Sequence, residues 1–429
     1  MRNTSVIQLL TGLAAVLILG AAAVPPSSKT SSPGAIPASE DPVARLQTRL
    51  DSGGARLGYE PGRGWLKSVL RELKVPAESQ GLVFSKTSFQ PTHISPRTPR
   101  AIYFNDDVYI GFVQGGSVLE VASIDPKNGT TFYALSQQKT DRPHFVRESA
   151  SCLQCHQSQL TGDVPGLLMR SVYPDSDGQP IFSAGTFVTT EQSPFKERWG
   201  GWYMDGKMTD PGLGNAILLD ADHPEQLTPT APDLRDQMDL APYLTPHSDP
   251  VALLVLAHQT HLHNLLARAA SETKRAAEDD AILRKMLRLP ADEHSDTFTL
   301  RLKSACDPVV QGLLFSGEAP ISGKVEGSTN FAAQFEKQGP FDARGRSFRQ
   351  FDLHQRLFKY PCSYLIYSEQ FDALPDPAKQ YVYRRLWQVL TGRDDSAAFS
   401  HLSDESREAI YQILCQTKAG LPAYWKARP

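Results

Sequence analysis

The sequence predicts an α+β protein in which an antiparallel sheet is followed by a mainly α-helical domain. Up to about residue 190, short runs of β-branched and aromatic residues alternate with turn residues, which is typical of strands joined by hairpins. From Pro250 onward, apolar residues recur at the three- and four-residue spacing of helices. Pro242, Pro246 and Pro250 crowd together between these parts, so we expect the boundary there.

Composition excludes several classes of protein. The 429 residues carry a formal net charge of −3, and 40% are apolar and 21% charged. These are ordinary globular values, which exclude wholesale disorder, collagen and a polytopic membrane protein. The 44 basic and 47 acidic side chains nearly balance, so no nucleic-acid partner is expected. Five cysteines are too few for a disulfide scaffold.

Residues 1–23 are expected to be a signal peptide. Arg2 supplies the positive charge, Ile7 to Ala23 is an uncharged apolar run, and three alanines end it as a cleavage pattern. An uncleaved membrane anchor is the alternative, because the run approaches the shortest length that spans a bilayer. No cysteine follows that run, which excludes a lipoprotein anchor. We expect export to the periplasm, with membrane contact only if this segment stays uncleaved.

A Pro/Ser-rich stretch over residues 24–42 is expected to be a flexible linker or a frayed mature N-terminus. The first folded domain is expected over residues 43–247. Helical spacing covers residues 43–73, and strand-like runs follow at 101–104, 108–113, 118–124 and 130–135. Asn128-Gly129 is a typical hairpin turn, and a second hairpin is expected from runs at 167–173 and 181–190.

The second domain is expected over residues 248–429. The apolar spacing predicts helices at 251–280, 280–287, 297–314, 371–390 and 403–416. Ser403 precedes the last of these as a capping residue.

The segment with the clearest chemistry is Cys152-Leu153-Gln154-Cys155-His156. This is C-x-x-C-H, the spacing that attaches c-type haem. Two thiols add to the two vinyl groups of one porphyrin, and the next residue places an imidazole under the iron. We therefore expect one covalent haem c, with Cys152 and Cys155 as the thioether residues and His156 as the iron ligand. Export agrees with this, because c-type haem is attached outside the cytoplasm.

Two other chemistries use paired cysteines. A zinc site would need a second ligand pair of similar spacing, and the sequence has neither a second C-x-x-C nor an H-x₃-H. A thioredoxin-like dithiol would begin a helix within a βαβ unit, which is not the pattern here. Hydrolase and nucleotide-binding fingerprints are also absent from the sequence.

Through Cys152, Cys155 and His156 the sequence resembles the c-type cytochromes. Overall it is similar to large periplasmic cytochrome c domain proteins with a single haem motif. A sheet before the motif departs from the small, all-helical class I cytochromes. That layout looks like the cytochrome P460 type or the PAS-like haem c sensors.

Function depends on the sixth ligand of the iron, since a strong ligand gives an electron carrier and an open position gives binding or catalysis. Met204 and Met208 lie in a loop-like segment, and His258 and His261 share one helical face. Each also has an ordinary alternative, as a surface methionine or as part of a polar helix stripe. Met169 is expected to pack in the core, and His144 to lie in a loop.

Other side chains are expected near a haem. Trp199, Trp202 and Tyr203 are either a haem wall or core packing. Arg170 and Arg198 are candidate partners of the haem propionates. The remaining cysteines allow one disulfide and one free thiol, or three unpaired thiols: Cys306, Cys362 and Cys415.

Together these features predict an exported cytochrome that transfers one electron at a time in the periplasm, with a redox partner protein. A haem enzyme with an open distal site, acting on peroxide or a small nitrogen compound, is one alternative. A haem-based sensor or interaction module is the other. The carrier predicts a filled sixth position, whereas the enzyme and the sensor predict an open one.

Overall fold

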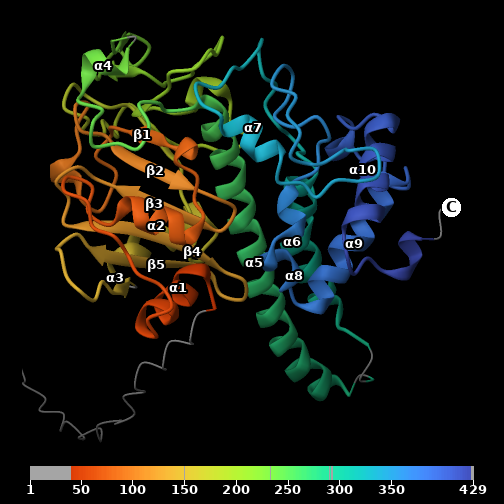
Figure 1. Cartoon of the computed structure of the whole chain (residues 1–429). Coiled ribbons are helices and arrows are strands. Elements are labelled where there is room, and N and C mark those ends of the chain that lie inside the picture. Colours follow the sequence, from red (N-terminus) through yellow and green to blue (C-terminus); the bar gives the residue numbers. More distant parts are fainter. Residues whose placement is uncertain (1–39, 149, 232, 289, 291–292, 427–429) are drawn as a thin grey trace, which may run out of the picture. The chain divides into compact units, whose positions relative to one another are not determined.

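The computed structural model describes residues 40–429, apart from residues 149, 232, 289, 291–292 and 427–429. The expected signal peptide (1–23) and nearly all of the expected linker (24–42) lie outside the described residues. The described residues all belong to one compact unit. Its first half holds an antiparallel sheet and its second half is helical, so the predicted α+β class is confirmed (Figure 1).

The main sheet has seven strands in the order β6-β5-β4-β3-β2-β1-β9, and every neighbouring pair is antiparallel. Four of its strands coincide with the predicted runs: β2 (Arg100–Phe104), β3 (Val108–Phe112), β4 (Val118–Asp125) and β5 (Gly129–Ser136). The other three are too short to show an alternating pattern and were not expected: β1 (Gly81–Val83), β6 (Phe145–Glu148) and β9 (Trp202–Tyr203).

Two small hairpins accompany this sheet. The expected second hairpin is confirmed in shorter form, as β7 (Arg170–Val172) paired with β8 (Thr186–Val188). The other hairpin joins β10 (Ala216–Leu218) to β11 (Leu227–Pro229). A short helix, α4 (Leu234–Gln237), follows them.

One face of the main sheet packs against the first two helices, α1 (Pro42–Asp51) and α2 (Leu66–Leu73). Alternate strand residues such as Tyr103, Ile110 and Val121 form a buried cluster with Leu46 and Leu70 of these helices. The helical spacing expected over 43–73 is confirmed as these two helices, and the residues between 52 and 65 form the turns that join them.

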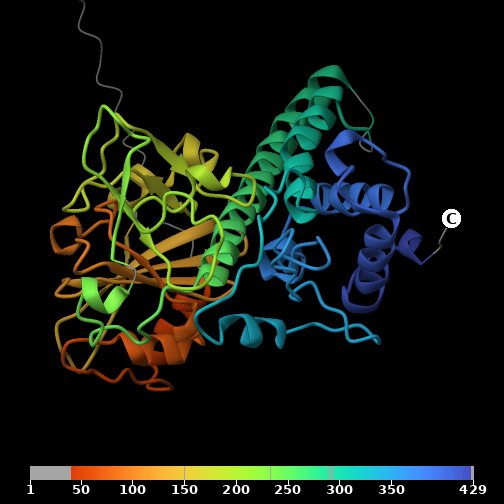
Figure 2. The same cartoon turned by 90° about the horizontal axis from the view of Figure 1, so that it is seen from above.

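The long helix α5 (Pro250–Leu287) lies between the sheet and the remaining helices (Figures 1 and 2). It joins the two expected helices at 251–280 and 280–287 into one. Asp249 caps it by accepting bonds from the backbone N–H groups of Val251 and Ala252, and Pro250 occupies its first turn. Its first turns are buried on all sides, as expected for a helix covered both by a sheet and by other helices.

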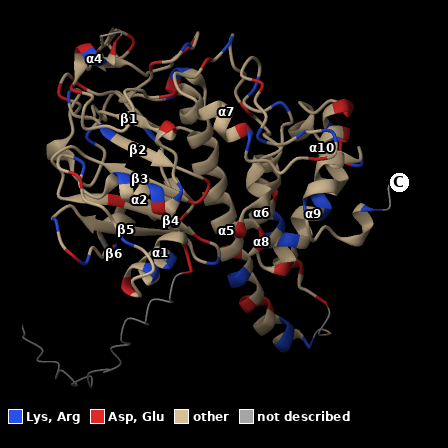
Figure 3. Ribbon diagram, in the orientation of Figure 1, with Lys and Arg blue, Asp and Glu red and all other residues tan. Residues whose placement is uncertain are grey.

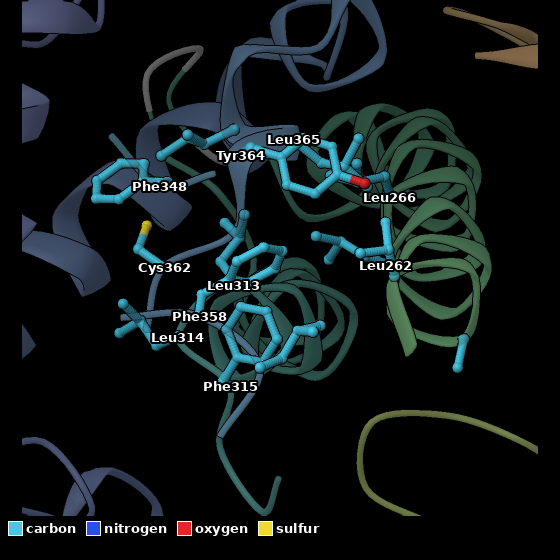
Figure 4. Close-up of a cluster of buried hydrophobic side chains, with 14 of the residues drawn as sticks. Leu262, Leu266, Leu313, Leu314, Phe315, Phe348, Phe358, Cys362, Tyr364 and Leu365 are labelled. Atoms are coloured by element: carbon cyan, nitrogen blue, oxygen red, sulfur yellow. The ribbon is translucent and has the colours of Figure 1, made fainter. Parts of the chain in front are cut away.

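The other side of α5 packs against four C-terminal helices: α6 (Asp296–Leu313), α7 (Phe331–Glu336), α8 (Glu369–Asp372) and α9 (Asp376–Leu390). The last helix, α10 (Asp404–Thr417), packs against α9. Figure 4 shows part of this core, in which Leu262 and Leu266 of α5 lie beside Leu313 and Tyr364. Ser403 caps α10 through the backbone N–H of Ser406, as predicted.

Charged residues are distributed along the whole described chain, with both signs interspersed on the sheet side and on the helical side (Figure 3). Among the described residues, no helix has the length and apolarity needed to cross a bilayer.

Candidate functional site

The C-x-x-C-H motif occupies a short helix, α3 (Ala150–His156), directly after the edge strand β6. Residues three and four apart share one side of a helix, so Cys152, Cys155 and His156 present their side chains together. All three line one pocket of about 490 Å³ beside the sheet. That volume lies within the range of sites that enclose a cofactor-sized ligand.

Small residues on the strands create this pocket. Gly111, Ala122 and Ala134 lie on the face of the sheet turned away from α1 and α2, and all three line the pocket. Larger side chains flank them on the same face, since Tyr109 pairs with Ala122 and Ala122 pairs with Phe132. The small side chains therefore leave space between the sheet and α3.

The covering side of the pocket comes from distant parts of the chain. It includes Leu167 and Met169 after the motif, Phe182 in the β7–β8 hairpin, and Leu256 and Thr260 of α5. Phe182 is 57% exposed, which places it at the mouth of the pocket.

His156 is held in one orientation by the loop that follows it. Its Nδ1 lies 2.9 Å from the carbonyl oxygen of Gly166. A carbonyl only accepts, so Nδ1 carries the proton and Nε2 retains the lone pair that a metal needs. Burial lowers the pKa of His156 despite this bond, which keeps the imidazole neutral. The ring also contacts Phe132, with centroids 4.7 Å apart.

The loop itself is tied to α5. The side-chain amide of Asn264 accepts the N–H of Leu167 and donates to its carbonyl, both at 2.8 Å. The Gly166 N–H donates to the carbonyl of His156, also at 2.8 Å. The orientation of His156 therefore depends on α5 as well as on α3.

Cys152 is half-buried and Cys155 is exposed, and both are free thiols. Burial raises the pKa of Cys152, so at neutral pH this thiol is protonated. Neither thiol is in a disulfide, which leaves both available to react with a ligand in the pocket.

Two arginines line the pocket, and each has an N–H group that donates no hydrogen bond to a described residue. Arg100 forms an ion pair with Glu120 at 2.6 Å, and Arg170 donates from Nη2 to Thr186. The Nε atoms of Arg100 and Arg170 are buried without a hydrogen-bond partner. Buried donors without a partner are costly, so a ligand that brings carboxylates would stabilise both.

These residues fit a haem c. The pocket supplies two thiols, one imidazole with a free Nε2, apolar walls, and two cations for the propionates. Of the two arginines considered as candidate partners of the propionates, Arg170 lines this pocket and Arg198 does not. Arg198 is buried elsewhere and donates to the backbone carbonyls of Ser193 and Glu191.

The four candidate sixth ligands lie outside this pocket. None of Met204, Met208, His258 and His261 is among its lining residues in the described chain. Met204 is buried in the core, and Met208 packs beside it. His258 lies 2.7 Å from the Ser363 hydroxyl, and His261 contacts Glu191 at 2.9 Å.

Met169 behaves differently from those four side chains. It was expected to pack in the core, and it is 2% exposed, but it also lines the pocket. His144 is exposed and is not among the lining residues. Within the described residues, no group of three or more His, Cys, Asp or Glu side chains could hold a metal ion.

Of the three aromatic residues considered either as a haem wall or as core packing, only Trp202 reaches the pocket. Trp202 lines it and donates from its indole N–H to the carbonyl of Arg170 at 2.7 Å. Trp199 packs against Phe195, and Tyr203 packs against Phe84 on the other face of the sheet. The segment at 202–208 was expected to be a loop, but Trp202 and Tyr203 form the edge strand β9.

The three other cysteines are not paired. Cys306 and Cys362 are buried and Cys415 is exposed, and all are free thiols. Of the two arrangements left open by the sequence, one disulfide or three unpaired thiols, the structure has the unpaired thiols. Burial raises the pKa of Cys306 to about 12.

No family model, curated protein or solved structure matches this chain. The resemblance to c-type cytochromes therefore stays a prediction that depends on the motif and on the pocket around it.

Sequence reasoning missed most of the pocket's floor. Arg100, Gly111, Glu120 and Phe132 lie on different strands, and no local motif connects them. The sequence did contain one indication of the pocket. Each of three strand-like runs of large residues is interrupted by a small residue, at Gly111, Ala122 and Ala134. Alternate residues of a strand lie on the same face of a sheet. Small residues on one face of three adjacent strands therefore indicate a hollow in that face.

Proposed function

We propose that this chain is an exported c-type cytochrome that carries one covalent haem and transfers single electrons in the periplasm. The observation that carries the proposal is that Cys152, Cys155 and the free Nε2 of His156 share one pocket of cofactor size. When bound, the haem supplies a one-electron ferric/ferrous couple, with donor and acceptor as partner redox proteins.

The chain's own residues would each have a separate task. Cys152 and Cys155 would anchor the ring through thioether bonds, and His156 would ligate the iron. The carbonyl of Gly166 would keep the imidazole in the ligating tautomer. Arg100 and Arg170 would receive the propionates, and the aromatic and aliphatic walls would exclude water.

A carrier also needs a sixth ligand, and Met169 is our proposal for it. Apart from the three motif residues, Met169 supplies the only thioether, thiol or imidazole among the described lining residues. If Met169 does not ligate, the sixth position is open. In that case the pocket would suit the alternative function, a haem enzyme acting on peroxide or a small nitrogen compound.

Covalent attachment is tested by producing the full chain in a host that matures c-type haem. We expect the purified polypeptide to retain haem colour after denaturation and to gain the mass of one haem. The double variant C152S/C155S should lose both, whereas C415S, an exposed cysteine outside the pocket, should lose neither. A wild-type chain without covalent haem would overturn the proposal. The same mass spectrum shows whether residues 1–23 are removed.

The sixth ligand is tested with carbon monoxide added to the dithionite-reduced protein. We expect the wild-type spectrum to remain unchanged and that of M169A to shift, because truncation opens the iron. M208A is the matched control and should behave like wild type, since Met208 lies outside the pocket lining. A shift in the wild type would favour the enzyme or the sensor over the carrier.

A further inference from the structure

The last two turns of α5 project from the folded unit (Figures 1 and 2). We infer that this extension, residues 281–288, binds the surface of a lipid bilayer that contains anionic phospholipids. The sequence predicted membrane contact only through residues 1–23, so this contact is a separate one. It does not depend on haem binding.

The packing of α5 against its neighbours ends at Asp280. Its carboxylate accepts the backbone N–H of Ser295 at 3.0 Å and the hydroxyl of Ser295 at 2.5 Å, so α6 begins beside it. Asp280 is the last buried residue of α5, and none of residues 281–288 is buried. The helix therefore continues for about two turns, or about 10 Å, beyond the helix that covers it.

Apolar side chains occupy one side of the extension. Ile282 and Met286 are four residues apart, as are Leu283 and Leu287, so the two pairs form adjoining rows on the helix. Ile282, Met286 and Leu287 are 62%, 75% and 59% exposed. Among the described residues, Met286 is the most exposed of the large apolar side chains. A cluster of exposed apolar side chains marks a contact site for a protein or a membrane.

Positive charges adjoin the apolar side. Residues 281–288 include Arg284, Lys285 and Arg288 and no acidic residue. Lys285 and Arg288 are exposed and lie three residues apart, so they share one side of the helix. The extension is thus amphipathic, as helices that lie at a membrane surface are. An anionic bilayer matches both sides at once, because it places an apolar layer directly beneath a negative surface.

The acidic residues near the extension are partly compensated. Asp280 forms an ion pair with Arg284 at 3.2 Å, and Asp279 pairs with an arginine of α6 at 2.6 Å. Glu278 precedes the extension and Glu293 follows it, and both are exposed. Because these two acids weaken the attraction to anionic lipids, insertion of the apolar side chains has to contribute most of the binding.

The chain enters the folded unit beside α5. Glu40 is the first described residue, and the ammonium of Lys127 pairs with its carboxylate at 3.2 Å. The ammonium of Lys274 donates to the carbonyl of Lys127 at 2.9 Å. Lys274 precedes Ile282 by eight residues, which is about 12 Å along the helix. Residues 1–39 therefore join the unit near the extension, and a bilayer entered by the apolar run at 7–23 would be held on that side.

Co-sedimentation of the purified full-length protein with vesicles tests the apolar contact. We expect binding to vesicles of equal parts phosphatidylglycerol and phosphatidylcholine. The variant I282S/M286S/L287S should bind them about tenfold or more weakly, because it removes the side chains that insert. L219S/F341S changes two exposed apolar residues outside the extension and should bind as wild type does. Thermal melts of each variant show that it is folded.

The same assay tests the charges. Vesicles of phosphatidylcholine alone should bind the wild type several-fold more weakly, since they lack negative charge. K285Q/R288Q should weaken binding to the anionic vesicles several-fold and leave binding to the neutral ones unchanged. K67Q/K337Q removes two exposed cations elsewhere and is the matched control.

A second measurement reports on the extension alone, because residues 1–23, where they are retained, would bind vesicles by themselves. M286W places an indole at the end of the extension, and brominated acyl chains quench an indole that lies among them. We expect vesicles with brominated lipids to quench M286W more than wild type. F341W, an exposed position in the helical half, should show no added quenching.

The inference is overturned if brominated vesicles quench M286W no more than F341W. It is also overturned if gel filtration without vesicles shows a dimer that I282S/M286S/L287S converts to a monomer while vesicle binding is unchanged. The extension would then be a contact between two copies of the chain. Haem content of the same samples reports separately on the proposed cytochrome function.

Discussion

Glu191 is a buried carboxylate that two imidazoles of α5 share. His261 Nδ1 lies 2.9 Å from one carboxylate oxygen, and His258 Nδ1 lies 3.6 Å from the other. Burial alone would raise the pKa of Glu191 and lower that of His261. The attraction between them prevails, so the pKa of Glu191 falls well below its usual range and that of His261 rises. His258 and His261, two of the candidate iron ligands, instead hold Glu191 and its neighbouring residues against α5.

The directions of these pKa shifts predict the pH range in which the substitution E191Q lowers the free energy of unfolding most. The lowered pKa of Glu191 contributes stability above its ordinary value of 4.5, and the raised pKa of His261 contributes stability below its ordinary value of 6.5. The cost of E191Q should therefore be greatest between these values, at about 2 kcal/mol, and should shrink as pH rises through the folded pKa of His261. Urea unfolding at about pH 5.5 and about pH 8.5 measures the difference. E405Q, an exposed carboxylate, is the control, and a cost independent of pH would contradict this account.

At the scale of secondary-structure elements, the first turn of α5 is the point where one side chain holds two elements together. The buried Asp249 caps the helix with one oxygen and accepts the N–H and the hydroxyl of Thr329 with the other. One carboxylate thus fixes both the first turn of α5 and the segment that leads into α7. An aspartate before a proline is a common helix start, although Pro250 served in the sequence prediction only to place the domain boundary.

Removing that cap should cost more than removing an exposed one. We expect D249A to lower the free energy of unfolding by about 2–4 kcal/mol, since it leaves several buried N–H groups unpaired. S403A removes the cap of α10, which is exposed, and should cost about 1 kcal/mol. Chemical denaturation of both variants measures these values. Equal losses would mean that the contacts of Asp249 with Thr329 contribute nothing.

At the scale of the whole molecule, α5 connects the sheet to the helical half. Its buried residues belong to one hydrophobic cluster that contains Ile102 and Tyr109 of the sheet and Leu313 and Tyr364 of the helical half. A single cluster of this kind makes each half depend on the other for burial of its apolar surface.

We therefore expect a chain that ends at residue 247 to fail to fold cooperatively. Without α5, the sheet face that carries Ile102, Phe104 and Tyr109 would lie open to water. Thermal unfolding followed by near-ultraviolet circular dichroism, together with limited proteolysis, checks this against the full chain. A sharp transition in the short chain would show that the sheet and its first two helices stabilise themselves.

The sequence by itself determined the α+β class, the strands β2 to β5, most helices after residue 250, and the short motif that suggests haem. Each is a local pattern: an alternation, a helical period, a cap, or five consecutive residues.

Tertiary structure alone decided which residues surround the motif. Arg100, Met169 and Thr260 are far from one another in sequence and meet in one pocket through strand pairing and the packing of α5. Met204 and His258 have the right chemistry, but core packing and hydrogen bonds hold them elsewhere. Side-chain chemistry can be read locally, whereas a cavity is defined by long-range contacts that no local pattern contains.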